Sequence, residues 1–549
     1  MIDVSLDAIR LFRRDREPLS LVEKIAFSIP SGATLGIVGE SGSGKSLTSL
    51  AIMGLLPRGM RAEGRVLLDG TDLLKLDDRQ MQHVRGARIG MIFQEPMTAL
   101  NPAMRIGDQI TEGLLAHRAV SRAEARAEAL RLLERVRIPD AARRIDAYPH
   151  ELSGGQRQRV GIAIALAPGP SLLIADEPTT ALDVTVQAEV LELLGELISE
   201  LRMSLLMISH DLGVVASICE RTLVMHAGRM VEAGPTETVL RHPSEAYTQR
   251  LLAAMPRIES AIEHEAEPSE RALPGTPPIL EVVNLERSYA PRSGSAPAKA
   301  VDGVSFEIPA GTIHGIVGES GCGKSTLARI VMALDRPTSG TVLFQGEDIF
   351  AKSPRELLAI RRGIQMVFQD PQGSLDPRQK VASIVAEPLH LDPAAPRGRD
   401  RERLVAETLL RVGLRKEDAQ RYPHEFSGGQ RQRIAIARAI IGHPKLIVAD
   451  EPVSALDLSV QAQILRLIRE LRDVHGLTFL FISHSLAVVE TISDRVGVMY
   501  RGRFVESGTA AEIFRHPTND YTRRLIDAEP RIDRPRRYGR AAADRTAVT

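Results

Sequence analysis

Short runs of apolar residues recur along the chain and predict strands buried on both faces. TLGIV at 34–38, LLIAD at 172–176 and LLMISH at 205–210 are three such runs. Segments such as 184–202 lie between them, and their apolar residues recur every three to four positions, as in helices. Strands that alternate with helices predict an α/β fold, with a mainly parallel sheet covered by helices.

This pattern occurs twice. GIVGESGSGKS at 36–46 returns as GIVGESGCGKS at 315–325, and LLIADEPTTALD at 172–183 returns as LIVADEPVSALD at 446–457. The glycine-rich loops are 279 residues apart, whereas the later shared motifs are all 274 residues apart. Each copy is far too long for a solenoid repeat, so the sequence predicts a duplicated domain.

The composition between the copies changes to that of a linker. Residues 259–278 contain five Glu and four Pro and show no apolar periodicity. We therefore expect a first domain over 1–258, an acidic, Pro-rich linker over 259–278 and a second domain over 279–533. Residues 534–549 form an Arg-rich tail that we expect to be frayed.

Composition excludes several classes of protein. The 549 residues carry 70 Lys plus Arg and 70 Asp plus Glu, a neutral balance that argues against nucleic-acid binding by bulk charge. Aromatic residues make up only 3%, and the two cysteines, Cys219 and Cys322, are too few for a four-cysteine zinc site or a cysteine-ligated iron–sulfur cluster. No signal peptide and no apolar run long enough for a membrane span is visible.

Both copies carry a G-x-x-x-x-G-K-[ST] phosphate-binding loop behind a predicted strand. Backbone N–H groups of such a loop and the following helix N-terminus bind phosphate, the Lys reaches the β- and γ-phosphates, and the hydroxyl ligates Mg²⁺. A glycine-rich turn that only caps a helix is the alternative, and its occurrence twice argues against it. The predicted loop residues are Gly39, Glu40, Ser41, Gly42, Ser43, Gly44, Lys45 and Ser46, and Gly318, Glu319, Ser320, Gly321, Cys322, Gly323, Lys324 and Ser325.

Paired acids follow the buried strands at Asp176-Glu177 and Asp450-Glu451. The carboxyl end of a strand in an α/β sheet faces the crevice where ligands bind. We expect each Asp to hold Mg²⁺ through water and each Glu to act as general base toward the attacking water. A helix N-cap carboxylate is the alternative. The residues thus predict two Mg²⁺-dependent nucleotide triphosphatases in one chain.

LSGGQ at 152–156 and FSGGQ at 426–430, together with glutamines and histidines at matching positions, resemble the ATP-binding cassette (ABC) family. The resemblance covers nearly the whole chain outside the linker and tail. It implies two tandem P-loop NTPase domains, each with a mainly parallel sheet core, a helical subdomain and a short C-terminal extension. In both copies the signature also offers a hydroxyl, glycine N–H groups and a helix start, which together can bind an anion.

The resemblance implies that each ATP is clamped between the loop of one copy and the signature of the other. One site would pair Lys45 with Ser427, and the other would pair Lys324 with Ser153. The predicted signature residues are Ser153, Gly154, Gly155 and Gln156, and Ser427, Gly428, Gly429 and Gln430.

Further roles are implied by the same resemblance. His210 and His484 would contact the γ-phosphate and the catalytic Glu, Gln94 and Gln369 would contact Mg²⁺ and water, and Asp183 and Asp457 would couple the sites. The alternatives are a structural histidine and a solvated glutamine. Tyr289 and Phe12 are candidates to stack on adenine, although core packing would explain Phe12 equally well.

The C-terminal segment of each copy indicates which group of ABC ATPases the chain resembles. LRHPSEAYTQRLLAAMPRI at 240–258 and FRHPTNDYTRRLIDAEPRI at 514–532 resemble the C-terminal extension of oligopeptide/dipeptide importer ATPases. The match is to double-cassette subunits of peptide- and glutathione-type importers. It implies ATP and Mg²⁺ as cofactors and two permeases and an extracytoplasmic solute-binding protein as partners. It also implies ATP hydrolysis at the cytoplasmic face of the bacterial plasma membrane.

Other assignments remain open or are disfavoured. Importers of nickel, opines or glycosides share these motifs. A translation ATPase would need a long basic linker, a DNA-repair ATPase would need zinc-binding cysteines, and a multidrug exporter normally carries membrane spans or different terminal extensions. No iron–sulfur cluster or zinc is expected, because neither extension contains cysteine.

Overall fold

The computed structural model describes residues 1–13, 17–94, 99–180, 182–256, 277–289, 298–454 and 456–532. It divides into two compact units, one of Met1–Ala253 together with the segment that begins at Pro530, and one of Ala254–Glu529. Nearly all of the predicted linker and the predicted tail, 534–549, lie outside the described residues. The boundaries predicted at 258, 278 and 533 lie in or beside such residues and stay predictions.

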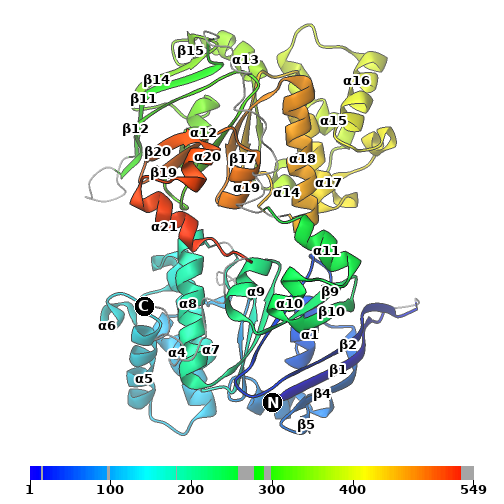
Figure 1. The fold of residues 1–549 in the computed structure, drawn as a ribbon, viewed down its shortest axis with the longest axis vertical. Coiled ribbons are helices and arrows are strands. Elements are labelled where there is room, and N and C mark those ends of the chain that lie inside the picture. Colours follow the sequence, from blue (N-terminus) through cyan, green and yellow to red (C-terminus); the bar gives the residue numbers. More distant parts are fainter. Residues whose placement is uncertain are drawn as a thin grey trace. The chain divides into compact units, whose positions relative to one another are not determined.

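The first unit is an α/β domain, in which strands and helices alternate along the chain (Figure 1). Its strands are β1 (Ile2–Leu11), β2 (Leu19–Ile29), β3 (Thr34–Val38), β4 (Met60–Leu68), β5 (Thr71–Asp72), β6 (Ile89–Ile92), β7 (Leu172–Asp176), β8 (Ser204–Ser209), β9 (Arg221–His226) and β10 (Arg229–Pro235). Its helices are α1 (Lys45–Ile52), α2 (Asp78–Val84), α4 (Ile106–His117), α5 (Arg122–Arg135), α6 (Ala141–Arg144), α7 (Gly154–Leu166), α8 (Val184–Leu201), α9 (Leu212–Ile218), α10 (Thr236–Arg241) and α11 (Ala246–Ala253), with 3₁₀ turns at Leu73–Lys75 and Pro149–Glu151.

The second unit repeats this order of elements. Its strands are β11 (Leu280–Tyr289), β12 (Ala298–Ile308), β13 (Ile313–Val317), β14 (Ser339–Phe344), β15 (Glu347–Asp348), β16 (Ile364–Val367), β17 (Leu446–Asp450), β18 (Thr478–Ile482), β19 (Arg495–Tyr500) and β20 (Arg503–Thr509). Its helices are α12 (Lys324–Val331), α13 (Pro354–Gly363), α14 (Pro371–Ser374), α15 (Val381–Val385), α16 (Gly398–Arg411), α17 (Gly428–Ile440), α18 (Leu458–His475), α19 (Leu486–Ile492), α20 (Ala510–Arg515) and α21 (Asp520–Ala528), with 3₁₀ turns at Glu387–Leu391, Lys416–Gln420 and Pro423–Glu425.

A parallel sheet forms the centre of each unit. In the first unit β6, β7, β8, β3 and β9 lie in that order and pair in parallel, and β10 adds an antiparallel edge. In the second unit the order is β16, β17, β18, β13, β19 and β20. The central strands are buried along almost their whole length, as their apolar sequences require. The α/β prediction is therefore confirmed.

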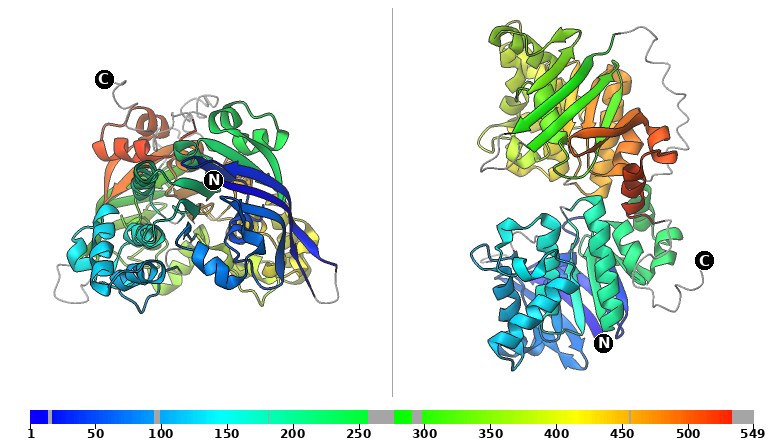
Figure 2. Two further views of the ribbon diagram at one scale, coloured as in Figure 1. Left: turned by 90° about the horizontal axis from the view of Figure 1, so that it is seen from below. Right: turned by 90° about the vertical axis from the view of Figure 1, so that its left-hand side faces the viewer.

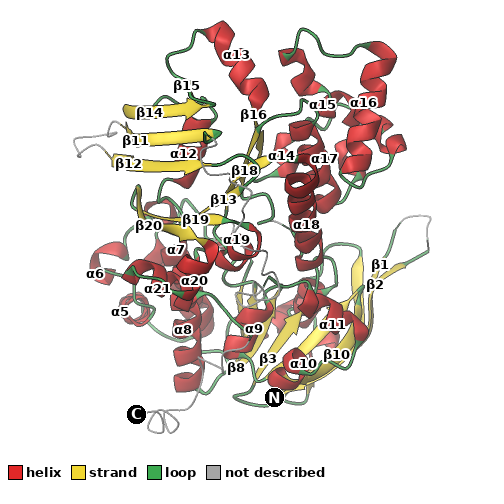
Figure 3. Cartoon of the chain, turned by 45° about the horizontal axis from the view of Figure 1, so that its top comes forward, coloured by secondary structure: helices red, strands yellow, loops and turns green. Residues whose placement is uncertain are grey.

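An antiparallel layer and a group of helices lie on different sides of this sheet. In the first unit β5, β4, β1 and β2 form the antiparallel layer, which joins β10 at one residue pair, Arg229 and Glu23. Figure 2 separates the blue strands of this layer from the cyan helical segment, and Figure 3 shows β12, β11 and β14 apart from α15–α18 in the second unit. Alternate residues of β1 are buried, which matches a sheet with one face on the core.

Local sequence fixes the helix starts. Ser121 and Glu124 form a reciprocal capping box at α5, and Ser353 and Glu356 form another at α13. The predicted helix at 184–202 is observed as α8, and it ends where Arg202 adopts a left-handed backbone. Within the described residues, every helix falls short of the length or apolarity that crossing a bilayer requires.

Candidate functional site

The first phosphate loop connects β3 to α1 and holds its own lysine. The loop glycines Gly39, Gly42 and Gly44 have positive φ angles of 153°, 73° and 97°. A Cβ on Gly39 would lie 2.2 Å from the carbonyl oxygen of Met225, so only glycine fits there. The Lys45 ammonium group donates to the carbonyl oxygens of Gly39 (2.7 Å) and Glu40 (2.8 Å). This arrangement places the cation inside the loop, where it can reach a bound phosphate.

The second phosphate loop has the same geometry. Lys324 donates to the carbonyl oxygens of Gly318 (2.6 Å) and Glu319 (2.9 Å). Its ammonium nitrogen lies 3.9 Å from the Sγ of Cys322, whereas Lys45 lies 3.5 Å from the Oγ of Ser43 at the matching position. The two loops therefore share one backbone and lysine geometry and differ at one side chain, and phosphate binding by them stays a prediction.

An acidic pair lies at the carboxyl end of β7, beside the first loop. The Ser46 hydroxyl donates to Asp176 Oδ1 at 3.1 Å. Burial raises the pKa of Asp176 to about 6. In the second unit burial, and then the charge of Glu451, raise the pKa of Asp450, whose Oδ1 is buried without a hydrogen-bond partner among the described residues. Burial thus disfavours the ionised form of both aspartates, and a nearby cation would stabilise that form.

Glu177 is the centre of a polar cluster in the first unit. Its Oε2 accepts hydrogen bonds from Gln94 Nε2 (2.9 Å) and Thr180 Oγ1 (2.9 Å), and His210 Nδ1 lies 3.1 Å from its Oε1. The structure thus brings together three predicted residues from distant parts of the sequence. Thr180 was not predicted, and the hydroxyl three residues after the glutamate is the only signal in the sequence that could have indicated it.

Glu451 is the matching centre in the second unit. Gln369 Nε2 donates to Glu451 Oε2 at 2.8 Å, and His484 Nδ1 lies 3.0 Å from the same oxygen. Ser454, at the position of Thr180, donates to the backbone carbonyl of Glu451 at 3.2 Å. The glutamine and histidine therefore contact the glutamate in both units, but they share one oxygen only in the second.

The histidines keep these glutamates ionised. Burial, the largest effect, opposes ionisation of Glu177 and Glu451. The hydrogen bond and charge of His210 or His484, together with a neighbouring hydroxyl and the loop lysine, outweigh burial and lower the pKa of each carboxyl group. The same hydrogen bonds raise the pKa of His210 and His484 against the effect of burial. A carboxylate that is charged at neutral pH and oriented by a histidine can accept a proton from water.

The backbone at both glutamates is strained. Glu177 and Glu451 have φ angles of 48° and 47°, in the left-handed region that side chains with a Cβ rarely adopt. The Glu177 N–H donates to the carbonyl oxygen of Ile208 at 2.9 Å, and the Glu451 N–H donates to that of Ile482 at 2.9 Å. The neighbouring strand therefore holds the turn that aims each carboxylate.

The signature residues begin α7 and α17. The Ser153 hydroxyl accepts from the Gln156 N–H at 3.3 Å, and Gln156 Oε1 accepts from the Ser153 N–H at 3.1 Å. Ser427 and Gln430 repeat this capping box. The side chain of each signature serine therefore caps its own helix.

The second signature glycine has a packing role that the sequence did not indicate. A Cβ on Gly155 would lie 2.4 Å from Val186 Cγ1 of α8, and a Cβ on Gly429 would lie 2.2 Å from Val460 Cγ1 of α18. Gly154 and Gly428 have no such close neighbour. The second glycine is therefore required for the close approach of two helices.

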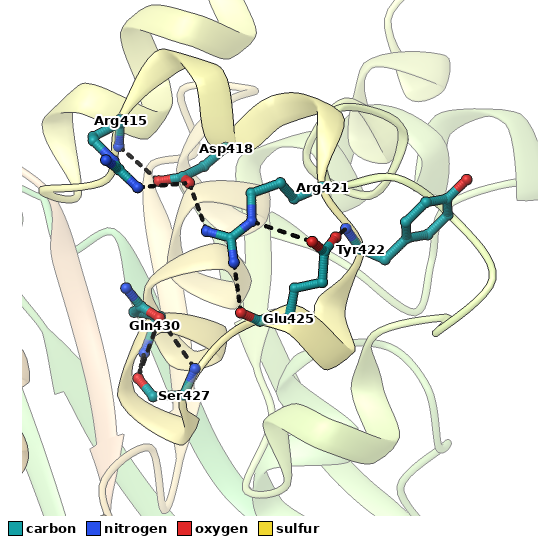
Figure 4. A network of polar contacts seen from close by, with 7 residues as sticks. All are labelled: Arg415, Asp418, Arg421, Tyr422, Glu425, Ser427 and Gln430. Atoms are coloured by element: carbon teal, nitrogen blue, oxygen red, sulfur yellow. Dashed lines mark hydrogen bonds and ion pairs between the residues drawn. The ribbon is translucent and has the colours of Figure 1, made fainter. Parts of the chain in front are cut away.

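The support behind the signature differs between the units. In the second unit the buried Asp418 accepts from the Arg415 N–H (3.0 Å) and from Arg421 Nη1 (3.1 Å), and Arg421 Nη2 donates to the Glu425 carbonyl at 2.7 Å (Figure 4). In the first unit Arg144 occupies the position of Asp418, and its Nη1 donates to Gln156 Oε1 at 3.4 Å. An arginine thus contacts the capping glutamine of one signature, while a carboxylate and arginines support the other.

The roles predicted for two further pairs of residues stay predictions, although the structure shows where these residues lie. Asp183 and Asp457 are the N-cap residues of α8 and α18. Tyr289 ends β11 and is 40% exposed, with its hydroxyl donating to Asp335 at 2.8 Å. Phe12 follows β1 and is 43% exposed, with the Arg61 guanidinium 5.6 Å from its ring centre. Phe12 is therefore not a core residue, and both rings remain accessible to a stacking partner.

Comparison with known families identifies the class of protein. The ABC transporter family model matches residues 22–180 and 301–454. The model for the oligopeptide/dipeptide transporter C-terminal region matches residues 231–284 and 505–548. The chain therefore belongs to the ABC transporter family, is an ATP-binding protein, and carries two cassettes.

Its similar relatives span almost the whole chain. Two proteins named glutathione import ATP-binding protein GsiA, from Shigella dysenteriae serotype 1 (strain Sd197) and Escherichia coli (strain K12), are each 46% identical over 559 residues. Each alignment covers 96% of this chain and 90% of the relative. A solved dimeric structure of the ATP-binding cassette MJ0796, bound to ADP and Pi, is 31% identical, covers 42% of this chain and 98% of that chain, and has a TM-score of 0.39.

Proposed function

We propose that this chain is the ATP-hydrolysing subunit of an ABC importer for di- or oligopeptides or glutathione-like solutes. The observation that carries hydrolysis is the Gln–Glu–His cluster, which is present in both cassettes beside a complete phosphate loop. The C-terminal region that both cassettes share, and the relatives named for glutathione import, support the solute class.

The chain's own residues supply the chemistry of hydrolysis. Lys45 and Lys324 exchange their loop carbonyls for the β- and γ-phosphates, which are stronger acceptors. The ionised Glu177 and Glu451 accept the proton of the attacking water, and His210 and His484 hold each carboxylate in position. Gln94 and Gln369 bind the same carboxylates and so report nucleotide occupancy to the helical subdomain that follows them.

The oxygen donors near each loop suit a magnesium ion. Hydroxyl, carboxylate and amide oxygens are its preferred protein ligands, and the orphaned Oδ1 of Asp450 is such a group. Ser46, Gln94 and Asp176 would hold the ion in the first cassette, and Ser325, Gln369 and Asp450 in the second. When bound, Mg²⁺ neutralises charge on the phosphate oxygens.

The two cassettes complete each other's sites in this proposal. Each signature offers a helix N-terminus whose capping serine can turn toward an anion. We assign Ser427 to the ATP on Lys45 and Ser153 to the ATP on Lys324. The aspartates Asp183 and Asp457 lie at the adjoining helix starts, where they would couple the two sites.

Disulfide formation tests this pairing. In full-length chain with Cys219→Ser, Cys322→Ser and Glu177→Gln, we expect Ser41→Cys to cross-link with Ser427→Cys when ATP is added. The matched control combines Ser41→Cys with Ser153→Cys of the same cassette and should not cross-link. Cross-linking of the control pair, with none of the test pair, would contradict the head-to-tail assignment.

The importer role predicts partners. We propose two permeases that span the membrane, with this chain on their cytoplasmic face, and an extracytoplasmic solute-binding protein. Co-expression with candidate permeases of this importer family should yield a complex whose ATPase rate rises when the solute-loaded binding protein is added. Absence of a complex with any permease would contradict the importer role while leaving ATP binding untouched.

A further inference from the structure

The C-terminal extension of the second cassette contacts the phosphate loop. Tyr521 is the second residue of α21, and its side chain is buried, at 6% exposure. Its hydroxyl oxygen accepts a hydrogen bond from the backbone N–H of Glu319 at 3.3 Å. A residue of the extension therefore reaches the second position of the loop, about 200 residues earlier in the chain.

A ring contact, a helix cap and the turn before α21 hold Tyr521 in place. Its ring lies 4.3 Å from the ring of Tyr500, which ends β19. Asn519 caps α21 and accepts from the Tyr521 N–H at 2.8 Å. The Glu506 carboxylate of β20 accepts from the N–H (2.6 Å) and hydroxyl (2.7 Å) of Thr518 and so fixes the turn before the helix. The hydroxyl therefore meets the loop from a fixed position.

The same loop residue holds the phosphate-binding lysine. The Glu319 carbonyl oxygen accepts from the Lys324 ammonium at 2.9 Å, while the Glu319 N–H donates to Tyr521. Loss of the tyrosine hydroxyl would free one side of this residue. The resting position of Lys324 would then be less well defined.

The first cassette makes the corresponding connection by another route. Tyr247 of α11 stacks on His226, with ring centres 4.0 Å apart, and His226 Nδ1 lies 3.8 Å from the Glu40 carboxylate. His226 occupies the position of Tyr500, and Glu40 that of Glu319. The extension thus reaches the second residue of both loops, through the backbone in one cassette and through side chains in the other.

We propose that Tyr521 is a positioning residue for ATP binding by the second cassette. It fixes the Glu319 backbone, and through it Lys324, so that the C-terminal extension sets the affinity of the loop for ATP. The inference requires only that the second loop binds ATP. It does not depend on the solute, the permeases or the pairing of the cassettes.

Removal of one oxygen atom tests this role. In the full-length chain with Lys45→Ala, which weakens binding to the first loop, Tyr521→Phe should raise the ATP dissociation constant about threefold to tenfold, the usual range for one neutral hydrogen bond. With Lys45 intact, the same change should raise the KM for ATP and alter kcat less than twofold. Tyr500→Phe is the matched control, because it removes the hydroxyl of the other ring in the pair. Within the described residues, that hydroxyl makes no hydrogen bond to the loop.

The outcomes separate positioning from folding. A higher dissociation constant for Tyr521→Phe, an unchanged one for Tyr500→Phe and equal thermal unfolding temperatures would support the proposal. An unchanged constant with fewer titrated sites would show a loss of folded protein and overturn it. An equal rise in both variants would also overturn it. The assay measures ATP binding alone. It would therefore test the role of Tyr521 even if the chain failed to hydrolyse ATP or to support transport.

Discussion

The two cassettes place the same four side chains together at the candidate site but differ in the residues around them. Lysine, glutamine, glutamate and histidine have matching partners in both. Around them Ser43 corresponds to Cys322, Leu35 to His314 and Arg144 to Asp418. Any functional difference between the cassettes should therefore come from the groups that support the contacts.

The largest expected effect is on ATPase rate, and it tests whether the glutamates that both cassettes share act in the same way. Glu177→Gln and Glu451→Gln keep the shape of the side chain but remove the base, and each should lower turnover at its own site roughly 10²- to 10⁴-fold. We expect the two single variants to have equal steady-state ATPase rates. Very unequal rates, measured for equally folded proteins, would mean that only one cassette hydrolyses ATP efficiently.

His314 should make the second cassette sensitive to acid. It is buried on β13, neither ring nitrogen has a hydrogen-bond partner among the described residues, and burial, followed by the charge of Arg495, lowers its pKa to about 4. Since the unfolded chain takes up a proton near pH 6.5 and the folded chain does not, stability is fully present above pH 6.5. It falls by about 3 kcal/mol as the pH drops toward 4.

His314→Leu, which copies Leu35 of the first cassette, should remove this part of the pH dependence. Calorimetric unfolding of the full chain between pH 7 and pH 4 would measure it, with Leu35→Met as the matched variant in the other cassette. If the His314→Leu protein loses stability with acid as steeply as the parent, another group is responsible.

Alkylation should distinguish the two phosphate loops. Cys322 lies beside the Lys324 ammonium, and a maleimide there would occupy space in the loop. In the Cys219→Ser background, N-ethylmaleimide should weaken ATP binding by the second loop more than tenfold and leave the first loop unaffected. Bound ATP should protect Cys322, and Cys322→Ser should be insensitive. Equal loss at both loops would refute this prediction.

The smallest effect concerns the support of the signatures. Asp418→Ala removes a buried carboxylate that pairs with a partly exposed Arg421, and it should destabilise the second cassette by about 1–2 kcal/mol. Arg144→Ala, with its long contact to Gln156, should cost below about 0.5 kcal/mol. Chemical denaturation of both variants would show whether the signatures differ in stability as the contacts indicate.

Much of this arrangement could be predicted because short motifs determine it locally. The apolar runs before Gly39 and Gly318 could only be buried strands, and the acids after LLIA and LIVA fall at strand ends, where Lys45 and Lys324 lie. The capping boxes of Ser153 and Ser427 follow from the S-x-x-Q spacing alone.

Contacts between distant segments could not be predicted in the same way. No spacing rule places Tyr521 against Glu319, because the contact depends on how α21 packs on β20. The left-handed backbone of Glu177 and the clash that requires glycine at Gly155 arise from neighbouring strands and helices. Such features belong to tertiary packing, which a single sequence shows only indirectly.

The fusion of two cassettes into one polypeptide has an evolutionary consequence. In a homodimer each substitution appears in both subunits at once, so a tolerated change must suit two environments together. Here Cys322 and His314 occur in one cassette only, and the corresponding positions of the other cassette hold Ser43 and Leu35. The covalent link also fixes a one-to-one ratio of the two cassettes, so their specialisation needs no control of relative expression.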